Sequence, residues 1–123
     1  MTDLTYEADV TITAGTGDAG VVFRATQPAV GTDAYRGYYA GLTTTGRIIL
    51  GKADKNWRQL ASAAFPVTRG ARYHLRIEAT GTTIKVYADS TLKLTVTDAT
   101  FTTGATGVRV FNTAASFDNI SID

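Results

Sequence analysis

The sequence contains no cysteine among its 123 residues. This absence excludes disulfide bonds, thiolate catalysis and zinc sites built on sulfur. It leaves the cellular compartment open, because exported bacterial domains often lack cysteine too. Histidine is limited to His74, and no serine lies in a Gly-x-Ser-x-Gly motif. The sequence therefore lacks the residue patterns of most nucleophilic and zinc-dependent hydrolases.

An excess of one charge and long apolar runs are also missing. The net charge is +1 and the basic residues are scattered singly, so we expect no nucleic acid partner. The longest apolar runs, such as Ile48-Ile49-Leu50, fall far short of the ~20 residues that a membrane helix needs. No positively charged leader precedes an apolar stretch. We therefore expect no membrane partner and no export signal within the chain itself.

Apolar residues nowhere keep the 3.6-residue period of a helix for long enough to form one. Residues 4–12 instead alternate apolar and polar side chains, which predicts a strand with one buried face. The inward-facing residues are then Leu4, Tyr6, Ala8, Val10 and Ile12. Glu7 and Asp9 are predicted to lie on the opposite, outer face.

Similar short strands follow along the rest of the chain, separated by glycine-containing turns. They are predicted at 21–25, 35–42, 47–52, 57–63, 72–79, 83–88, 92–97, 108–111 and 116–122. A turn is predicted over 14–20, and a longer loop over 26–33 because Pro28 and Gly31 do not suit a central strand. This spacing favours an all-β fold, a two-sheet antiparallel sandwich. The length fits one domain over residues 1–123.

Six stretches of the chain together resemble the concanavalin A-like jelly-roll domains. They are Tyr6-Glu7-Ala8-Asp9-Val10, Gly20-Val21-Val22-Phe23-Arg24-Ala25, Gly37-Tyr38-Tyr39-Ala40-Gly41-Leu42, Ile49-Leu50-Gly51-Lys52-Ala53, Tyr73-His74-Leu75-Arg76-Ile77 and Phe117-Asp118-Asn119-Ile120. Within that superfamily the chain is most similar to the family 66 carbohydrate-binding modules. Those modules accompany secreted fructan-degrading and other glycoside hydrolases and bind the ends of fructan chains.

The resemblance implies a non-catalytic carbohydrate-binding module of a secreted glycoside hydrolase. Its expected partners are a polysaccharide, with fructan (levan) as the first ligand, and the catalytic domain of the parent protein. We expect a monomeric domain that is extracellular as part of a larger protein. A laminin G-like adhesion or spacer module with no sugar ligand is the alternative, because a shared fold does not select one function.

A sugar-binding face needs aromatic rings for the apolar side of the sugar and charged or amide groups for its hydroxyls. Glu7 and Asp9 on the first predicted strand and Arg24 on the second are assigned to outer faces, where they could hold vicinal hydroxyls. The alternative is a cross-strand ion pair between Glu7 and Arg24 that contributes roughly 0.2–1 kcal/mol and has no role in binding.

Two aromatic residues and one amide complete the candidate ligand-binding set. The alternation puts Tyr38 in the core and leaves Tyr39 outside as a platform for a sugar ring. Trp57 begins a strand beside a polar turn, which suits either a stacking residue or a tryptophan at the rim of the core. Asn112 is predicted in a turn, where it either contacts a ligand or serves the turn itself.

Catalysis and metal binding have weaker support. A glycosidase needs two carboxylates facing each other across a cleft. Glu7 with Asp9, or Glu78 with Asp9, would fill that role only by assumption. His74 reads as a residue on a strand face, and Asp118 and Asn119 as structural hydrogen-bonding residues. We expect no required cofactor. A structural calcium ion held by loop oxygens of Asp18, Asp33 or Asp118 stays open.

Overall fold

A computed structural model describes residues 3–26, 36–54, 57–101 and 104–122 of the chain. These residues form eight strands and no helix. The strands are β1 (Leu4–Thr26), β2 (Arg36–Thr43), β3 (Arg47–Asp54), β4 (Trp57–Ala64), β5 (Arg72–Thr80), β6 (Thr83–Ala88), β7 (Thr91–Thr97) and β8 (Ala105–Ile122). Within the ranges described, no helix is therefore long and apolar enough to cross a membrane.

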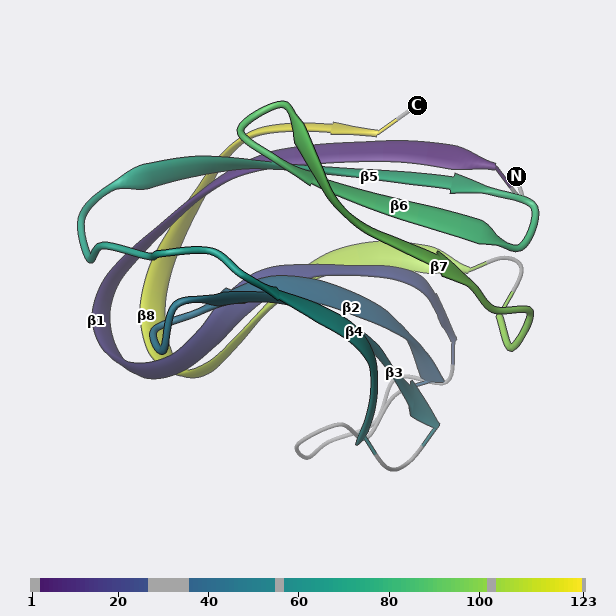
Figure 1. The fold of residues 1–123 in the computed structure, drawn as a ribbon, viewed down its shortest axis with the longest axis horizontal. Coiled ribbons are helices and arrows are strands. Elements are labelled where there is room, and N and C mark those ends of the chain that lie inside the picture. Colours follow the sequence, from purple (N-terminus) through teal and green to yellow (C-terminus); the bar gives the residue numbers. More distant parts are fainter. Residues whose placement is uncertain (1–2, 27–35, 55–56, 102–103, 123) are drawn as a thin grey trace.

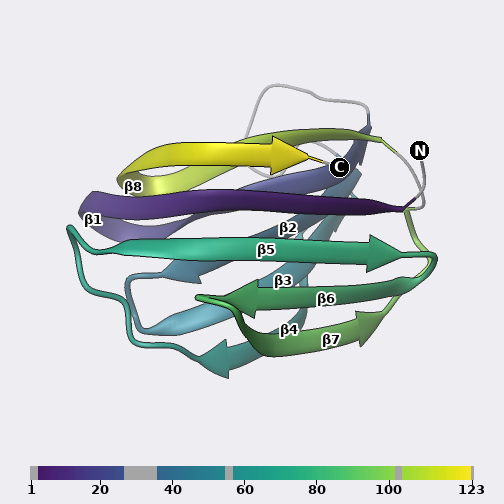
Figure 2. The ribbon, with the colours of Figure 1, turned by 90° about the horizontal axis from the view of Figure 1, so that it is seen from above.

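The strands build a sandwich of two layers (Figure 1). One layer contains β2, β3 and β4, and the other contains β5, β6 and β7, which lie side by side in Figure 2. β1 and β8 run through both layers, since β1 pairs with β2 over one half and with β5 over the other. All pairings are antiparallel. The all-β sandwich predicted from the sequence is confirmed.

β1 and β8 are longer than the sequence pattern predicts. Each was expected as two strands with a turn between them, over 14–20 and 112–115, but both turn segments are paired strand that bends from one layer to the other. β-bulges on either side of Gly15 provide the bend. Gly15 has a φ of 91°, and a Cβ there or at Gly17 would overlap the backbone of β8. The glycines that predicted a turn thus permit a bend with close strand contact.

The bend also changes which residues of β1 face the core. In its first half the even-numbered residues Tyr6, Ala8, Val10 and Ile12 are buried between the layers. After the bulges the odd-numbered residues take this place, namely Ala19, Val21 and Phe23. The alternation of β1 therefore shifts by one residue within the bend between Ile12 and Ala19. The first set agrees with the sequence prediction, whereas Ala19 was expected in the turn over 14–20.

Each layer has an outer face directed away from this core. The "β5 face" is the outer face of the β5–β7 layer and carries Glu7, Asp9, His74, Arg76 and Asn119. The "β2 face" is the outer face of the β2–β4 layer and carries Asp18, Tyr39, Ile49, Trp57 and Arg109. The two faces lie on opposite sides of the sandwich, so a small ligand contacts only one of them.

Candidate functional site

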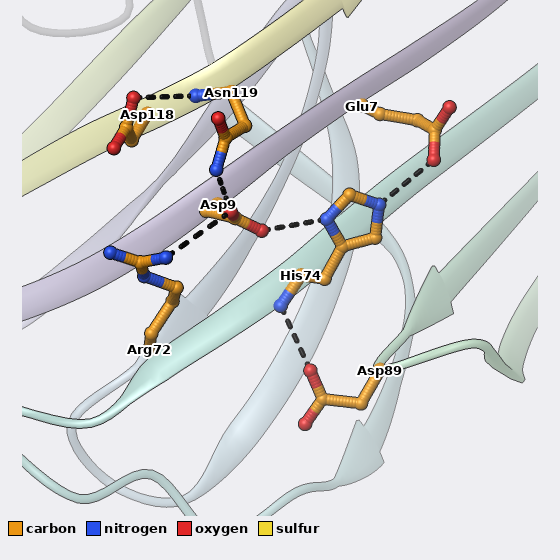
Figure 3. Close-up of polar contacts among 7 residues, drawn as sticks. All are labelled: Glu7, Asp9, Arg72, His74, Asp89, Asp118 and Asn119. Carbon is orange, nitrogen blue, oxygen red and sulfur yellow. Dashed lines mark hydrogen bonds and ion pairs between the residues drawn. The ribbon is translucent and has the colours of Figure 1, made fainter.

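Glu7 and Asp9 lie on the outer face of β1, as predicted, and both hold His74 of β5 (Figure 3). The Nε2 atom of His74 is 2.8 Å from Oε1 of Glu7, and its Nδ1 atom is 2.7 Å from Oδ1 of Asp9. The strand register brings the three together. Asp9 is directly opposite His74, and Glu7 comes two residues before Asp9 on the same face of β1. The prediction that His74 lies on a strand face is confirmed.

The two carboxylates favour the charged form of the imidazole. The hydrogen bond with Glu7, and next that with Asp9, raises the pKa of His74 above its usual value, against a smaller effect of burial. In the charged form both ring nitrogens donate, one to each carboxylate. Hydrogen bonds from Asn119 and then from His74 lower the pKa of Asp9. The three side chains thus form a charged network on the β5 face.

Neighbouring polar groups extend this network (Figure 3). The side-chain amide of Asn119 donates to Oδ2 of Asp9 at 2.6 Å, and the backbone N–H of Asn119 donates to Asp118 at 2.8 Å. The backbone N–H of His74 donates to Oδ1 of Asp89 at 2.9 Å. Asp118 and Asn119 therefore act as structural hydrogen-bonding residues, as expected from the sequence.

Arg24 does not lie on an outer face, so the predicted pairing with Glu7 is wrong. Its backbone has a φ of 50°, a left-handed conformation that turns the side chain inward. The guanidinium is fully buried and donates to the carbonyl oxygens of Gly81, at 2.9 Å, and Phe101, at 3.3 Å. Arg24 thus joins β1 to the β5–β6 turn and to the segment before β8.

Tyr39 faces outward from β2, as the alternation predicts, but it is not an exposed platform. Its exposed fraction is 0%. It belongs to a small cluster with Val22 and Ile49, against which Trp57 packs. The ring of Trp57 meets that of Tyr39 edge to face, with 5.9 Å between centroids. Trp57 itself stays partly exposed. A partly buried tryptophan packed against this cluster fits both the stacking and the rim-of-core alternatives, so both stay open.

Two charged residues contact Tyr39, of which Asp18 was considered only as a calcium ligand and Arg109 was not singled out from the sequence. The hydroxyl of Tyr39 donates to Oδ1 of Asp18 at 2.5 Å, and the guanidinium of Arg109 lies over the Tyr39 ring, 5.0 Å from its centroid. Arg109 also lies over Phe111, and its Nη1 atom is 3.7 Å from Oδ1 of Asp18. The register of β1 with β8 brings this group together. Arg109 is opposite Gly20, and Gly20 comes two residues after Asp18 on β1.

Glycines make space for these side chains on the β2 face. A Cβ on Gly41 would overlap the Tyr39 ring, and a Cβ on Gly51 would overlap the indole of Trp57. Gly20 of β1 lies between Gly41 of β2 and Arg109 of β8. The three glycines Gly20, Gly41 and Gly51 are all buried. Aromatic rings can therefore lie flat across the sheet.

Asn112 and the proposed metal ligands are not gathered in one place. Asn112 lies at the bend of β8, with a φ of 52° and an exposed side chain. Its predicted position in a turn between two strands is wrong, because β8 continues through it. Asp18 and Asp118 lie in different layers, and Asp33 is outside the described residues. Among the residues that are described, no three acidic, histidine or cysteine side chains cluster as metal ligands.

Comparison with solved structures supports the expected jelly-roll fold. The carbohydrate-binding module CBM66 from Bacillus subtilis superposes with a TM-score of 0.91 at 29% sequence identity, covering 100% of this chain and 76% of that one. The galectin LEC-6 of Caenorhabditis elegans superposes with a TM-score of 0.71 at 10% identity, over 98% of this chain and 83% of that one. The galectin likeness concerns the fold alone, whereas the first match confirms the resemblance to family 66 carbohydrate-binding modules.

Sequence comparison finds levanases. A levanase of Bacillus subtilis (strain 168) is 32% identical over 123 residues, which cover 97% of this chain and 17% of that protein. A levanase of Bacillus sp. (strain L7) is 30% identical over 122 residues, covering 98% of this chain and 13% of that protein. The chain thus spans a small part of these relatives. The model of the 3-keto-alpha-glucoside-1,2-lyase-like domain matches residues 1–123, and the chain belongs to this family.

Proposed function

We propose that the chain is a non-catalytic carbohydrate-binding module of a secreted glycoside hydrolase, with fructan as its ligand. The observation that carries this proposal is the similarity to the CBM66 module, at a TM-score of 0.91 and 29% identity. Two levanase relatives support fructan as the first ligand to test. In such an arrangement the module raises the concentration of the linked enzyme at its polysaccharide.

The β2 face suits a sugar better than the β5 face does. Trp57 is a partly exposed indole that lies on Gly51 and is supported from the side by Tyr39. Such a fixed ring can stack on the apolar C–H side of a sugar at a small entropic cost. The charged groups Asp18 and Arg109 lie beside the same Tyr39 ring. Aromatic surface and hydroxyl-binding groups thus occur together on this face. The β5 face carries a similar group in Arg76, Glu78 and Tyr87 but no indole, so Trp57 is what favours the β2 face.

The polar groups of the β5 face bind one another, as Asp18 and Arg109 do on the β2 face. Glu7 and Asp9 both hold His74, and Asn119 holds Asp9. A ligand that bound there would have to replace these charge-assisted bonds. The contact of Glu7 and Asp9 with sugar, predicted from the sequence, remains a prediction that the experiment below tests.

A catalytic role has less support than a binding role, although the family is named after a lyase. Glu7 and Asp9 are neighbours on one strand face with His74 held by both, an arrangement unlike two carboxylates that face each other across a cleft. If the domain were a hydrolase or lyase, the isolated protein would degrade a polysaccharide and Glu7→Gln would stop it. We expect no turnover of any polysaccharide in the panel below.

Isothermal titration of the purified domain against levan, inulin, xylan, arabinan and β-glucan tests the proposal. We expect binding to fructan that Trp57→Ala weakens by about tenfold or more and that Glu7→Gln leaves unchanged. Loss of binding in Glu7→Gln with normal affinity in Trp57→Ala would move the site to the β5 face. A folded domain that binds none of these glycans would contradict the proposed function and favour an adhesion or spacer module.

A further inference from the structure

We propose that Asp18 and Arg109 together recognise a pair of neighbouring hydroxyls on an uncharged sugar. This inference rests on the proposed function and makes it more specific, because it names the chemical group that is bound and the class of glycan that is rejected. The pair lies on the β2 face, apart from the Glu7, Asp9 and His74 network on the other side of the sandwich.

The geometry of the pair suits two hydroxyls. Nη1 of Arg109 and Oδ1 of Asp18 are 3.7 Å apart, so N–H donors and carboxylate acceptors lie side by side. Each hydroxyl of a vicinal diol both donates and accepts a hydrogen bond. One hydroxyl can therefore accept from the guanidinium while its neighbour donates to the carboxylate, and both bonds are charge-assisted.

The two side chains are held in place before any ligand arrives. Arg109 lies over the rings of Tyr39 and Phe111, at 5.0 Å and 5.7 Å from their centroids. Asp18 accepts a hydrogen bond from the Tyr39 hydroxyl, and its backbone carbonyl accepts one from Thr113. Their side chains are 17% and 18% exposed, so they are largely shielded yet reachable from solvent. Fixed, partly desolvated charges bind with a smaller loss of entropy than mobile ones.

Tyr39 links the pair to the stacking surface. Arg109 lies over its ring and Trp57 meets it edge to face, with 5.9 Å between centroids. A sugar stacked on Trp57 therefore extends toward Arg109 and Asp18. Trp57 provides affinity by stacking on the sugar ring, while Asp18 and Arg109 recognise the hydroxyls.

The charges of the pair select against acidic sugars. A guanidinium alone would attract the carboxylate of a uronic acid, because the two form bidentate bonds. Here Asp18 balances the charge of Arg109 and would repel a second carboxylate beside it. The site therefore favours neutral glycans such as fructans over polyuronates.

Titration of Arg109→Ala, Arg109→Lys and Asp18→Asn with levan oligosaccharides and with oligogalacturonate tests this inference. We expect Arg109→Ala and Asp18→Asn each to lose about tenfold or more in affinity for the neutral ligand. Arg109→Lys keeps the charge without the planar donor fork, so its loss should be smaller. Asp18→Asn removes the repulsion and should gain measurable binding to oligogalacturonate. A purely structural role for Asp18 would produce no such gain.

The β5 face provides a matched control. Arg76 lies over the ring of Tyr87 at 5.8 Å and its Nη2 atom is 2.6 Å from Oε2 of Glu78, so it repeats the same residue types on the opposite side. Arg76→Ala and Glu78→Gln should leave both affinities unchanged, while circular dichroism verifies that all variants are folded. If folded Asp18→Asn and Arg109→Lys bind as tightly as wild type while Trp57→Ala does not, this inference is wrong and the proposed function stands. If the wild-type domain binds no glycan at all, both fail.

Discussion

The guanidinium of Arg24 lies between the two layers because its backbone is left-handed, with a φ of 50°. The period-2 pattern of strands puts Val22 and Arg24 on one face, and Val22 does lie outward. The left-handed backbone of Arg24 then turns its side chain into the protein. No feature of the sequence around Arg24 signals this angle, because left-handed arginine is uncommon and has no characteristic neighbours.

The burial of Arg24 leads to a prediction about stability. Arg24→Leu leaves the carbonyl oxygens of Gly81 and Phe101 without their buried donor. We expect the free energy of unfolding in urea to fall by about 1–3 kcal/mol or more. Sugar affinity of the folded protein should stay unchanged, since Arg24 is 0% exposed. In the control variant Arg76→Leu, which breaks a partly exposed ion pair, the free energy of unfolding should fall by less than about 1 kcal/mol. An equal fall in the two variants would contradict the structural role of Arg24.

The His74 network predicts a dependence of stability on pH. Since the pKa of His74 is raised in the folded protein, its contribution is complete below the unfolded pKa of about 6.5. This contribution is lost as pH rises through the folded pKa. Asp9 has a lowered pKa, so its contribution is lost only in acid, below about pH 4. Unfolding in urea between pH 6 and 9 should show stability falling with pH in wild type, with a smaller slope in His74→Gln.

NMR titration of the His74 ring verifies the cause directly. The midpoint should lie above the usual histidine value in wild type and should fall in Glu7→Gln, because the bond to Glu7 is the largest contribution to the raised pKa. A midpoint at or below about 6.5 in wild type would show that the two carboxylates do not stabilise the charged ring.

The glycines of the β2 face determine which side chains its strands can hold. A Cβ on Gly41 would come within 2.6 Å of Cζ of Tyr39. Gly41→Ala should therefore lower the free energy of unfolding by about 1–3 kcal/mol through overpacking and should also weaken sugar binding by displacing Tyr39. At Gly107 of β8 a Cβ would meet no atom within 4 Å, so Gly107→Ala is the matched control. Equal stability of the two variants in urea would contradict this role of Gly41.

The first half of β1, β5 and β6 could be predicted from their two-residue alternation, whereas β2 and β3 are buried on both faces, do not alternate, and were indicated by the spacing of turns. The bends could not be predicted, since Gly15 and Gly17 suit a turn as well as a bulged strand. Only part of the candidate site could be predicted from the sequence. Trp57 was predicted, whereas Asp18 and Arg109 lie far apart in sequence and meet only through the register of β1 with β8. Register of this kind depends on the complete sheet, which short-range patterns do not specify.

As a whole, the molecule has one core between two layers and two chemically different outer faces. The β5 face has a charged network centred on His74 and an ion pair of Arg76 with Glu78 beside Tyr87, but no indole. The β2 face combines a partly exposed indole with a partly exposed charge pair. This asymmetry is why we propose that only one side of the sandwich contacts the polysaccharide.

A module that acts by tethering should affect only polymeric substrates. Fused to a fructan-degrading catalytic domain, it should increase the rate on insoluble levan and leave the rate on short soluble fructo-oligosaccharides unchanged, because tethering raises only the local concentration at a surface. The same fusion with Trp57→Ala should lose the gain. A gain on short substrates of similar size would point to a direct effect on the catalytic domain instead.

The most direct test of the central claim is a ¹H–¹⁵N NMR titration of the domain with a levan oligosaccharide. Our account predicts that the largest shifts occur at the indole N–H of Trp57 and at the backbone amides of Asp18 and Arg109, with small shifts at Glu7 and His74. Shifts centred on Glu7 and His74, with Trp57 unmoved, would contradict the assignment of the sugar site to the β2 face.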